Sequence, residues 1–384
     1  MTTTTPIDPR RRDTRTGGRF DALDGIRTLA VLAVMFFHMV PAAVRGGGVG
    51  VDVFFTLSGF VITTVLLKEY QATGRVRLGI FYSLRISRLW PALFAVCAVV
   101  AGTAFLLPSS FWGGEQSNAL RSALHVMNFF RGGWFGESGD GGSMGHTWSL
   151  AVEEQFYILW PALFIVVLRF VRNLRTLAIL TSTACIAVVA ERGLLQLLGA
   201  GYERIYNGPD TRADQLLIGC LLAMILTLLP DSGPRKVLAV KLSRWALWPS
   251  TAFVVVAILT FAYPHGDDMV SLIYRSIFPM IIALAASTLI CGLVLNLGHP
   301  LSRMLSVSWL SWPGKHLSYG MYLWHYPIFF LIRGLYDGPG STLVRLPIGI
   351  ALTLLLAYLS ARYVEEPVRA AMKNRIASKK SVAA

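Results

Sequence analysis

The feature that most constrains this chain is a series of long apolar runs that recurs from one end of the sequence to the other. A helix rises about 1.5 Å per residue, so about 20 apolar residues cross a bilayer core of about 30 Å. We expect ten such spans, at 23–40, 49–67, 89–107, 147–168, 176–197, 213–229, 245–263, 274–297, 317–336 and 346–363. The predicted fold is therefore all-α, a polytopic bundle of about ten transmembrane helices.

The composition supports a membrane protein and argues against other classes. With 54% hydrophobic and 15% charged residues, the chain is too apolar for a soluble protein of 384 residues. A net charge of +14 is compatible with nucleic-acid binding, but the basic residues fall in short stretches between apolar runs and not on one soluble surface. We therefore expect membrane lipid around the chain and no nucleic-acid partner.

The distribution of Lys and Arg predicts the topology. With the N-terminus in the cytoplasm, most of the basic residues between spans fall on the inside, as the positive-inside rule requires. Both termini are then cytoplasmic, and the even number of spans agrees. We expect a basic N-terminal tail at 1–20, one transmembrane domain at 21–366 and a basic C-terminal tail at 367–384. Residues 1–20 lack the pattern of a removable signal peptide, so the first span should remain as an anchor.

Two further features bear on organisation. The longest outside segment, 108–146, is rich in Gly and aromatic residues, and we expect it to rest on the membrane surface or to cap a cavity. The four cysteines are isolated in apolar stretches, with no spacing that indicates a disulfide framework or a metal site. We therefore interpret them as packing residues and expect no metal.

The first span carries Arg27 and His38, eleven residues apart and so nearly on one helix face, about 16 Å apart along the axis. Ionisable groups in a bilayer need a partner, a wet cavity or a function. Taken alone, the pair is more often structural: Arg27 would pair with Asp24 or reach the interface, and His38 would be an interfacial histidine with satisfied hydrogen bonds.

Two arginines precede the third span. Arg85 and Arg88 share a helix face at i and i+3 on the cytoplasmic side, where guanidinium groups could hold a phosphate-bearing ligand. An equally good interpretation from this segment alone is that they only set the topology.

The fourth span contains Glu153 and Glu154 near its outer end. By depth, Glu153 could reach the level of His38, where a carboxylate would orient the imidazole and raise its basicity, as a general base requires. The structural alternative is a buried pair with Arg or with backbone donors.

Polar residues also mark the second and ninth spans. Asp52 lies at the outer start of the second span, followed by Ser58 and Gly59, where glycine allows helices to approach closely. In the ninth span, Tyr322 and His325 lie on one polar stripe, and a mid-membrane histidine implies a cavity or a hydrogen-bonded partner.

Taken together, these segments resemble the membrane-bound acyltransferase-3 family, which includes bacterial O-acetyltransferases of surface polysaccharides and enzymes that acylate antibiotics. The strings that carry the resemblance are Leu23-Asp24-Gly25-Ile26-Arg27 with His38, Gly50-Val51-Asp52-Val53-Phe54-Phe55 with Ser58-Gly59-Phe60, Arg85-Ile86-Ser87-Arg88, Trp148-Ser149-Leu150 with Glu153-Glu154-Gln155-Phe156-Tyr157, Ser318-Tyr319 with His325, and Glu365-Glu366-Pro367. They occur in the family's order over nearly the whole chain, and the combination is far more specific than any one string.

The resemblance implies a role for each of these residues and reverses the structural interpretation of Arg27, His38 and the two arginines. It implies catalysis by His38, Glu153 and Arg27, and binding of the acyl donor by Arg85 and Arg88. We also expect substrate contacts from polar and aromatic residues of the matching strings, which are Asp52, Ser58, Trp148, Tyr157, Tyr322 and His325.

The expected reaction is transfer of an acyl group, acetyl by family frequency, from cytoplasmic acyl-coenzyme A as co-substrate, with no bound cofactor. The acceptor would be a hydroxyl of a polysaccharide, a glycolipid or a macrolide-like natural product, and the location a bacterial plasma membrane. His38, oriented by Glu153, would remove the hydroxyl proton or would itself carry the acyl group. The rival function is a multi-pass transporter or flippase, whose buried charges would line a transport path. A catalytically inactive sensor of acyl-coenzyme A or lipid is the third possibility.

Overall fold

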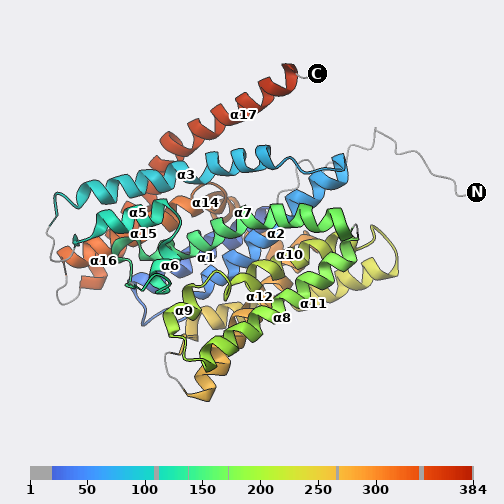
Figure 1. Cartoon of the computed structure of the whole chain (residues 1–384), viewed down its shortest axis with the longest axis horizontal. Helices are drawn as coiled ribbons and strands as arrows, with labels where there is room; N and C mark the ends of the chain where they lie inside the picture. The colour runs from blue at the N-terminus through green and yellow to red at the C-terminus, as the bar shows by residue number, and fades with distance from the viewer. Residues whose placement is uncertain are drawn as a thin grey trace, which may run out of the picture.

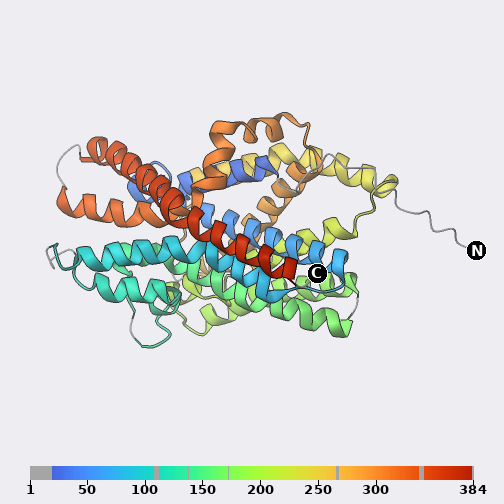
Figure 2. The same ribbon diagram turned by 90° about the horizontal axis from the view of Figure 1, so that it is seen from above.

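The computed structural model of the chain describes residues 20–107, 112–136, 138–171, 173–264, 268–336 and 341–382, and every regular element in these ranges is a helix. The elements are α1 (Asp21–Met39), α2 (Val49–Thr73), α3 (Leu78–Thr103), α5 (Glu115–Ala123), α6 (Met127–Arg131), the 3₁₀ helix η1 (Gly142–Thr147), α7 (Trp148–Val171), α8 (Leu174–Leu197), α9 (Tyr202–Asn207), α10 (Ala213–Leu228), α11 (Pro234–Thr260), α12 (Met269–Leu295), α13 (Pro300–Leu305), α14 (Ser308–His316), α15 (Ser318–Leu335), α16 (Ser341–Ser360), the π helix η2 (Ala361–Glu365) and α17 (Glu366–Val382). Apart from Phe20, the predicted N-terminal tail at 1–20 lies outside the described residues. The long helices lie side by side along one direction (Figures 1 and 2).

Each of the ten expected spans coincides with a helix, namely α1, α2, α3, α7, α8, α10, α11, α12, α15 and α16. Within the described part of the chain, eight helical segments are long and apolar enough to cross a membrane. The two that fall outside this group are α10, with 16 residues, and α15, with 18 residues. The predicted all-α polytopic fold is confirmed, and the count of ten depends on these two helices.

The third helix is longer than its apolar run. We expected a span from residue 89, but α3 begins at Leu78 and includes both Arg85 and Arg88. The guanidinium of Arg85 is tolerated inside the bundle because Glu154 of α7 accepts its hydrogen bond at 2.8 Å. The two arginines are therefore held by a rigid helix and not by a loop.

Helices α2 and α10 approach each other closely at two glycines. A Cβ atom on Gly59 would collide with the backbone of Leu216, and one on Gly219 would collide with the backbone of Thr56. Small residues allow such backbone contact between membrane helices, as we predicted for Gly59. This contact holds α2, which carries Ser58, in a fixed position.

The predicted outside segment 108–146 folds over one end of the bundle. Its described residues form α5, α6 and η1, which lie with α9 toward the same end of the molecule (Figure 1). Buried hydrogen bonds fix this cap, because the carboxylate of Glu115 accepts from both the backbone N–H and the hydroxyl of Ser143. We expected this segment either to rest on the membrane surface or to cap a cavity. It caps a cavity, because Arg131 and His146 line the one described below.

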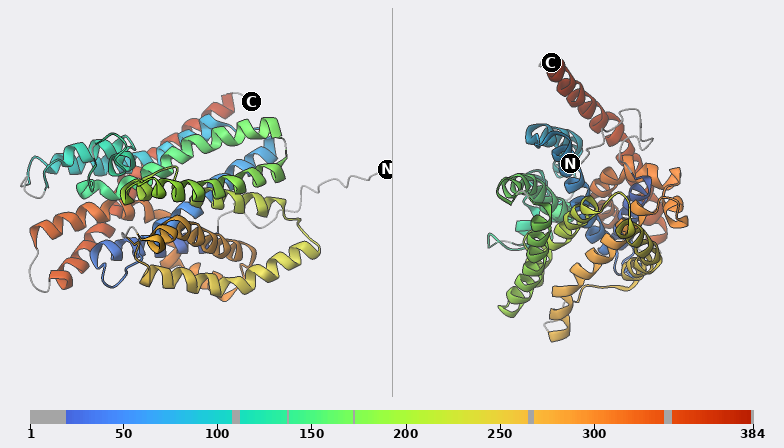
Figure 3. Two further views of the ribbon diagram at one scale, coloured as in Figure 1. Left: turned by 60° about the horizontal axis from the view of Figure 1, so that its bottom comes forward. Right: turned by 90° about the vertical axis from the view of Figure 1, so that its right-hand side faces the viewer.

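The chain leaves the bundle through a π-helical turn. Helix α16 continues through η2 into α17, which extends away from the other helices (Figure 3). Glu365, at the end of η2, is buried, whereas most of α17 is exposed. Short π segments inside helices often mark functional positions, and this one lies at the C-terminal end of the predicted transmembrane domain at 21–366.

Candidate functional site

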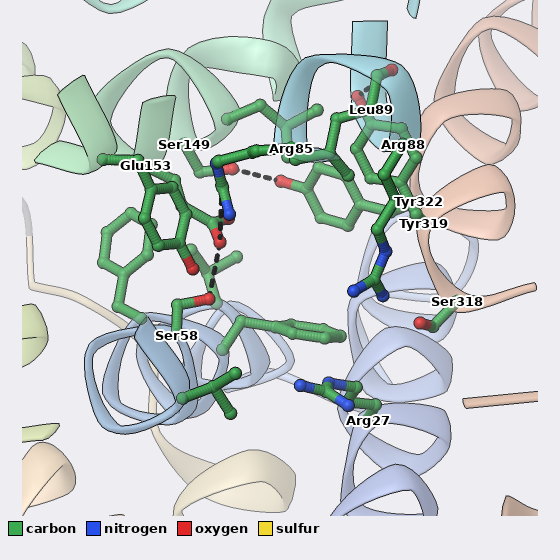
Figure 4. Close-up of a pocket in the computed structure, with 16 residues that line it drawn as sticks. Arg27, Ser58, Arg85, Arg88, Leu89, Ser149, Glu153, Ser318, Tyr319 and Tyr322 are labelled. Atoms are coloured by element: carbon green, nitrogen blue, oxygen red, sulfur yellow. Dashed lines mark hydrogen bonds and ion pairs between the residues drawn. The ribbon is translucent and has the colours of Figure 1, made fainter. Parts of the chain in front are cut away.

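Most of the site residues predicted from sequence converge on one cavity between α1, α2, α3, α7 and α15, which we call the arginine cavity. It is lined by Arg27, Arg85, Arg88, Ser58, Glu153 and Tyr157, together with apolar and aromatic residues of the same helices. Figure 4 shows the three arginine side chains directed into this space from two helices. The cavity therefore offers guanidinium groups around an open volume of about 130 Å³.

Arg85 contacts two carboxylates and an aromatic ring. It donates to Glu154, lies 3.8 Å from the carboxylate of Glu153, and places its guanidinium carbon 2.9 Å from the centre of the Tyr157 ring. Such an arrangement, with two carboxylates and an aromatic face, orients the planar guanidinium group rigidly. Tyr157 and Glu153 thus act on the cavity through Arg85.

Arg27 has the partner that the structural interpretation predicted and also lines the cavity. It donates to Asp24 at 2.5 Å, and its side chain keeps 19% of its surface exposed. A guanidinium has five N–H donors, so one carboxylate partner leaves others directed toward the cavity. The ion pair and a binding role are therefore compatible.

Glu153 lies in the arginine cavity and not beside His38. Its carboxylate accepts a hydrogen bond from Ser58 at 2.5 Å and faces Arg85 (Figure 4). The predicted Glu153–His38 contact was wrong. The depth estimate was one-dimensional, and it did not include the direction in which α7 presents this face.

His38 lies in a second cavity, which we call the histidine cavity, between α1, α2, α6, η1, α7, α9 and α15. It is lined by His38, Arg131, His146, Trp148, Tyr206 and Tyr326, with a few apolar residues. The imidazole of His38 meets that of His325, with Nδ1 of His38 3.0 Å from Nε2 of His325 and the two rings stacked at 5.2 Å. His325 is fully buried, so it is a partner of His38, and its predicted role as a substrate ligand has no geometric support.

The backbone fixes which nitrogen of His38 is free. Nδ1 of His325 lies 2.7 Å from the carbonyl oxygen of Tyr322, and a carbonyl can only accept, so this nitrogen carries the proton. In neutral His325 the other nitrogen, Nε2, must then accept, and Nδ1 of His38 must donate to it. The lone pair of neutral His38 is therefore on Nε2. This tautomer leaves a base or a nucleophile available on the side away from His325.

Tyr322 separates the two cavities. Tyr322 and Val51 line both of them, while the adjacent residues Trp148 and Ser149 line the histidine cavity and the arginine cavity respectively. The Tyr322 hydroxyl lies 2.6 Å from the Ser149 hydroxyl and 3.0 Å from the carbonyl oxygen of His146. The cavities thus meet at a partition that the hydrogen bonds of Tyr322 hold in place.

Asp52 lies outside both cavities. It is fully buried, forms an ion pair with Arg212 at 3.1 Å and accepts a hydrogen bond from Tyr263 at 3.2 Å. Its predicted role in substrate binding has no geometric support, because its carboxylate faces protein partners. The other predicted substrate ligands each line a cavity: Ser58 and Tyr157 the first, Trp148 the second, and Tyr322 both.

The sequence analysis missed Arg131, His146, Tyr206 and Tyr326, all of which line the histidine cavity. Arg131 and Tyr206 come from α6 and α9, which are too short for a periodic pattern to be recognised. Burial raises the pKa of Tyr206, so its hydroxyl stays protonated and can donate a hydrogen bond at neutral pH. In the sequence, the one indication of these residues was His146, an ionisable residue directly before the fourth expected span.

Comparison with known proteins identifies the family of the chain. A family described as "Acyltransferase domain" matches residues 20–362. The chain is 31% identical to peptidoglycan O-acetyltransferase OatA of Listeria monocytogenes, over 94% of the chain and 57% of that protein. It is 31% identical to the putative peptidoglycan O-acetyltransferase YrhL of Bacillus subtilis, over 90% of the chain and 54% of that protein. A putative O-acetyltransferase of Staphylococcus aureus is 30% identical over 90% of the chain and 57% of its own length.

The chain spans just over half the length of these curated relatives. No solved structure matches it significantly. The family match extends from Phe20, at the start of α1, to Arg362, in η2, and so includes every helix that lines the two cavities. With a family match over nearly its whole length, the chain belongs to the acyltransferase family that the sequence motifs indicated.

Proposed function

We propose that the chain is a membrane O-acyltransferase that moves an acetyl group from cytoplasmic acetyl-coenzyme A to a hydroxyl of a cell-envelope glycan. The observation that carries the proposal is the pair of cavities that meet at Tyr322, one with three arginines and the other with an imidazole whose Nε2 is free. The names of two relatives support a peptidoglycan-like acceptor. The proposal places the protein in a bacterial plasma membrane with both termini in the cytoplasm.

Each cavity has a part in the proposed reaction. The phosphate groups of the donor bind to the guanidinium groups of Arg27, Arg85 and Arg88, since guanidinium forks match phosphate oxygens. Glu153, with Glu154, holds Arg85 in place. The thioester then lies next to Tyr322, and the acceptor hydroxyl enters the histidine cavity.

In the direct route, Nε2 of His38 removes the proton of the acceptor hydroxyl as its oxygen attacks the thioester carbonyl. The C–S bond breaks, and the thiolate of coenzyme A leaves and takes up a proton. The hydrogen bond to His325 stabilises the imidazolium that forms, because proton transfer to Nε2 strengthens donation from Nδ1. His325 therefore takes the orienting role that we first assigned to Glu153.

A two-step route uses the same atoms. Nε2 of His38 attacks the thioester, coenzyme A leaves, and the acceptor hydroxyl then attacks the acyl-imidazole. Incubation of purified protein with labelled acetyl-coenzyme A and no acceptor distinguishes the routes. The two-step route leaves acid-labile label on His38, whereas the direct route leaves none.

The first test of the function is transfer of label from radiolabelled acetyl-coenzyme A. Membranes that contain wild type or His38→Ala at matched expression are extracted into lipid, polysaccharide and small-molecule fractions. Label should enter a product with wild type only, and the labelled fraction identifies the acceptor class. His316→Ala is the control, because His316 stacks on Trp312 and lines neither cavity.

Two outcomes contradict the proposal. Equal labelling by wild type and His38→Ala makes His38 structural. No labelling with several acyl donors favours the rival transporter or flippase, which binds a lipid-linked or sugar substrate without chemical change.

A further inference from the structure

The histidine cavity contains a cation that the proposed chemistry does not use. Arg131, the last residue of α6, lines this cavity together with His38 and His146. It lies within electrostatic range of both imidazole rings. The donor phosphates already have three arginines in the other cavity, so a fourth guanidinium on the acceptor side needs its own explanation.

The hydrogen bonds of Arg131 are weak and incomplete. Nη1 donates to the carbonyl oxygen of Gly145 at 3.2 Å, Nη2 is 3.5 Å from the carboxylate of Glu203, and Nε is buried without a hydrogen-bond partner. Glu203 is a poor counter-ion, because its side chain is 51% exposed and the same oxygen accepts from Asn207 at 2.6 Å. Short bidentate contacts are the stronger arrangement for a guanidinium and a carboxylate, and Arg131 lacks one.

A well-paired arginine in the same molecule shows the difference. Arg192 binds both oxygens of Asp214, at 2.8 and 2.7 Å, and its Nε donates to the carbonyl oxygen of Ser276. Arg131 lines a cavity and retains donors without a strong partner, whereas Arg192 makes four hydrogen bonds to protein groups.

The surroundings indicate what the free donors would bind. Trp148, Tyr206 and Tyr326 contribute aromatic rings to the cavity wall, and such rings pack against the apolar faces of sugars. The cavity is small, about 40 Å³, so it takes the reacting end of an acceptor and one neighbouring group. A carboxylate or phosphate group is the chemistry that an under-paired guanidinium recognises.

We propose that Arg131 forms an anion subsite for the acceptor, so that the preferred substrate is a saccharide with a carboxylate or phosphate group near the reacting hydroxyl. The inference rests on the proposed function and narrows its acceptor class. Arg131 binds the charged group, and this contact places the hydroxyl at Nε2 of His38.

The test uses equilibrium binding of four sugars to purified full-length protein in nanodiscs. Glucuronate carries a carboxylate, glucose 6-phosphate carries a phosphate, and glucuronamide and glucose are neutral. Wild type should bind at least one charged sugar roughly tenfold more tightly than the neutral ones, as expected for a charge-assisted hydrogen bond. The preferred charged sugar identifies the source of the anionic group.

Variants of Arg131 connect this preference to one side chain. Arg131→Gln should abolish the preference and leave binding of the neutral sugars unchanged, and Arg131→Lys should retain part of it. Arg121→Gln is the matched control, because Arg121 stacks on Phe130 at 3.7 Å and does not line the cavity.

Three results overturn the inference: equal affinity of wild type for charged and neutral sugars, retention of the preference by Arg131→Gln, or equal loss of all binding in that variant. The last result makes Arg131 structural. An oxyanion-stabilising role would instead lower kcat for every acceptor and leave the binding preference intact. Discrimination without any acetyl transfer would support the subsite and count against the acyltransferase proposal, so the two can fail separately.

Discussion

Arg192 and Asp214, between α8 and α10, are both fully buried and form a bidentate ion pair, whereas Arg85 and Glu153 in the arginine cavity keep 18% and 19% of their side-chain surfaces exposed. Asp52 and Arg212 belong with the first pair, and we call these four residues the closed cluster. The void beside the closed cluster is about 10 Å³, at the lower limit for one water molecule, against about 130 Å³ in the arginine cavity.

The comparison shows that buried charge alone does not identify a functional site in a membrane protein. Both groups contain ionisable residues within the bundle, where each unpaired charge is costly. In the closed cluster the charges bind each other and fasten α2, α8 and α10 together. In the arginine cavity the charges surround open space. The adjacent open volume distinguishes the two groups, and this volume is not visible in a sequence.

The largest expected effect is on stability, from Arg192→Met. Loss of the Arg192 guanidinium leaves the carboxylate of Asp214 buried without its cation, which lowers the free energy of unfolding by about 3–5 kcal/mol. The free energy of unfolding and the yield of folded protein should fall accordingly, as measured by thermal unfolding in detergent. Arg169→Met, on the exposed end of α7, is the control. An unchanged melting temperature would remove the distinction between the two clusters.

Next in size is the effect of Arg88→Gln on donor binding. Removing one guanidinium contact to a phosphate should raise the KM for acetyl-coenzyme A roughly ten- to hundredfold, with a melting temperature close to wild type. The KM of Arg88→Lys should lie between those of wild type and Arg88→Gln, because lysine keeps the positive charge and lacks the planar fork of guanidinium donors. The labelled-acetyl assay measures both. If Arg88→Gln instead unfolds as readily as Arg192→Met, this arginine is structural.

Asp52→Asn tests a residue that sequence and structure interpret differently. The structure predicts a loss of about 1–3 kcal/mol of stability, because Arg212 keeps its buried charge with a weaker partner. The KM values for donor and acceptor should not change. A higher acceptor KM at unchanged stability would restore the substrate role that the sequence suggested.

The smallest expected effect comes from Tyr322→Phe. The change removes the hydroxyl that bonds to Ser149 and to the carbonyl oxygen of His146. Each lost hydrogen bond should lower the free energy of unfolding by about 0.5–1.5 kcal/mol. With the partition weakened, water should reach the thioester, and acetyl-coenzyme A hydrolysis without acceptor should rise. Tyr319→Phe is the control, because Tyr319 lines only the arginine cavity and donates to the carbonyl oxygen of Leu89. Equal hydrolysis in the two variants would show that Tyr322 does not seal the partition.

Part of the site was predictable from local patterns. Arg85 and Arg88 share a face of α3, and Ser58, Tyr157 and Tyr322 each line a cavity, while their roles in substrate binding stay predictions. A hydrogen-bonded partner for His325 was also foreseen in outline, because a histidine at mid-membrane depth implies a partner or a cavity, and the structure gives His38 as that partner. These predictions succeed because helix periodicity and depth follow from residue spacing alone.

Predictions about pairs of residues on different helices did worse. Glu153 bonds to Ser58 and faces Arg85, Asp52 pairs with Arg212, and His325 pairs with His38. Each of these contacts joins residues far apart in the chain, and spacing within one helix gives no information about which helix lies opposite. The sequence interpretation chose Glu153 as the partner of His38 because their depths matched, but the rotation of α7 about its axis directs Glu153 elsewhere.

The sequence by itself determined the all-helical membrane fold, the family and the residues that could carry chemistry, because hydropathy, helix periodicity and motif order are properties of local sequence. Only the tertiary structure decided that these residues divide between two cavities and a closed cluster. It also brought Arg131 and His146 from the short elements α6 and η1 to His38. Such choices depend on how whole helices rotate and pack, and packing is the joint result of contacts spread over the entire chain.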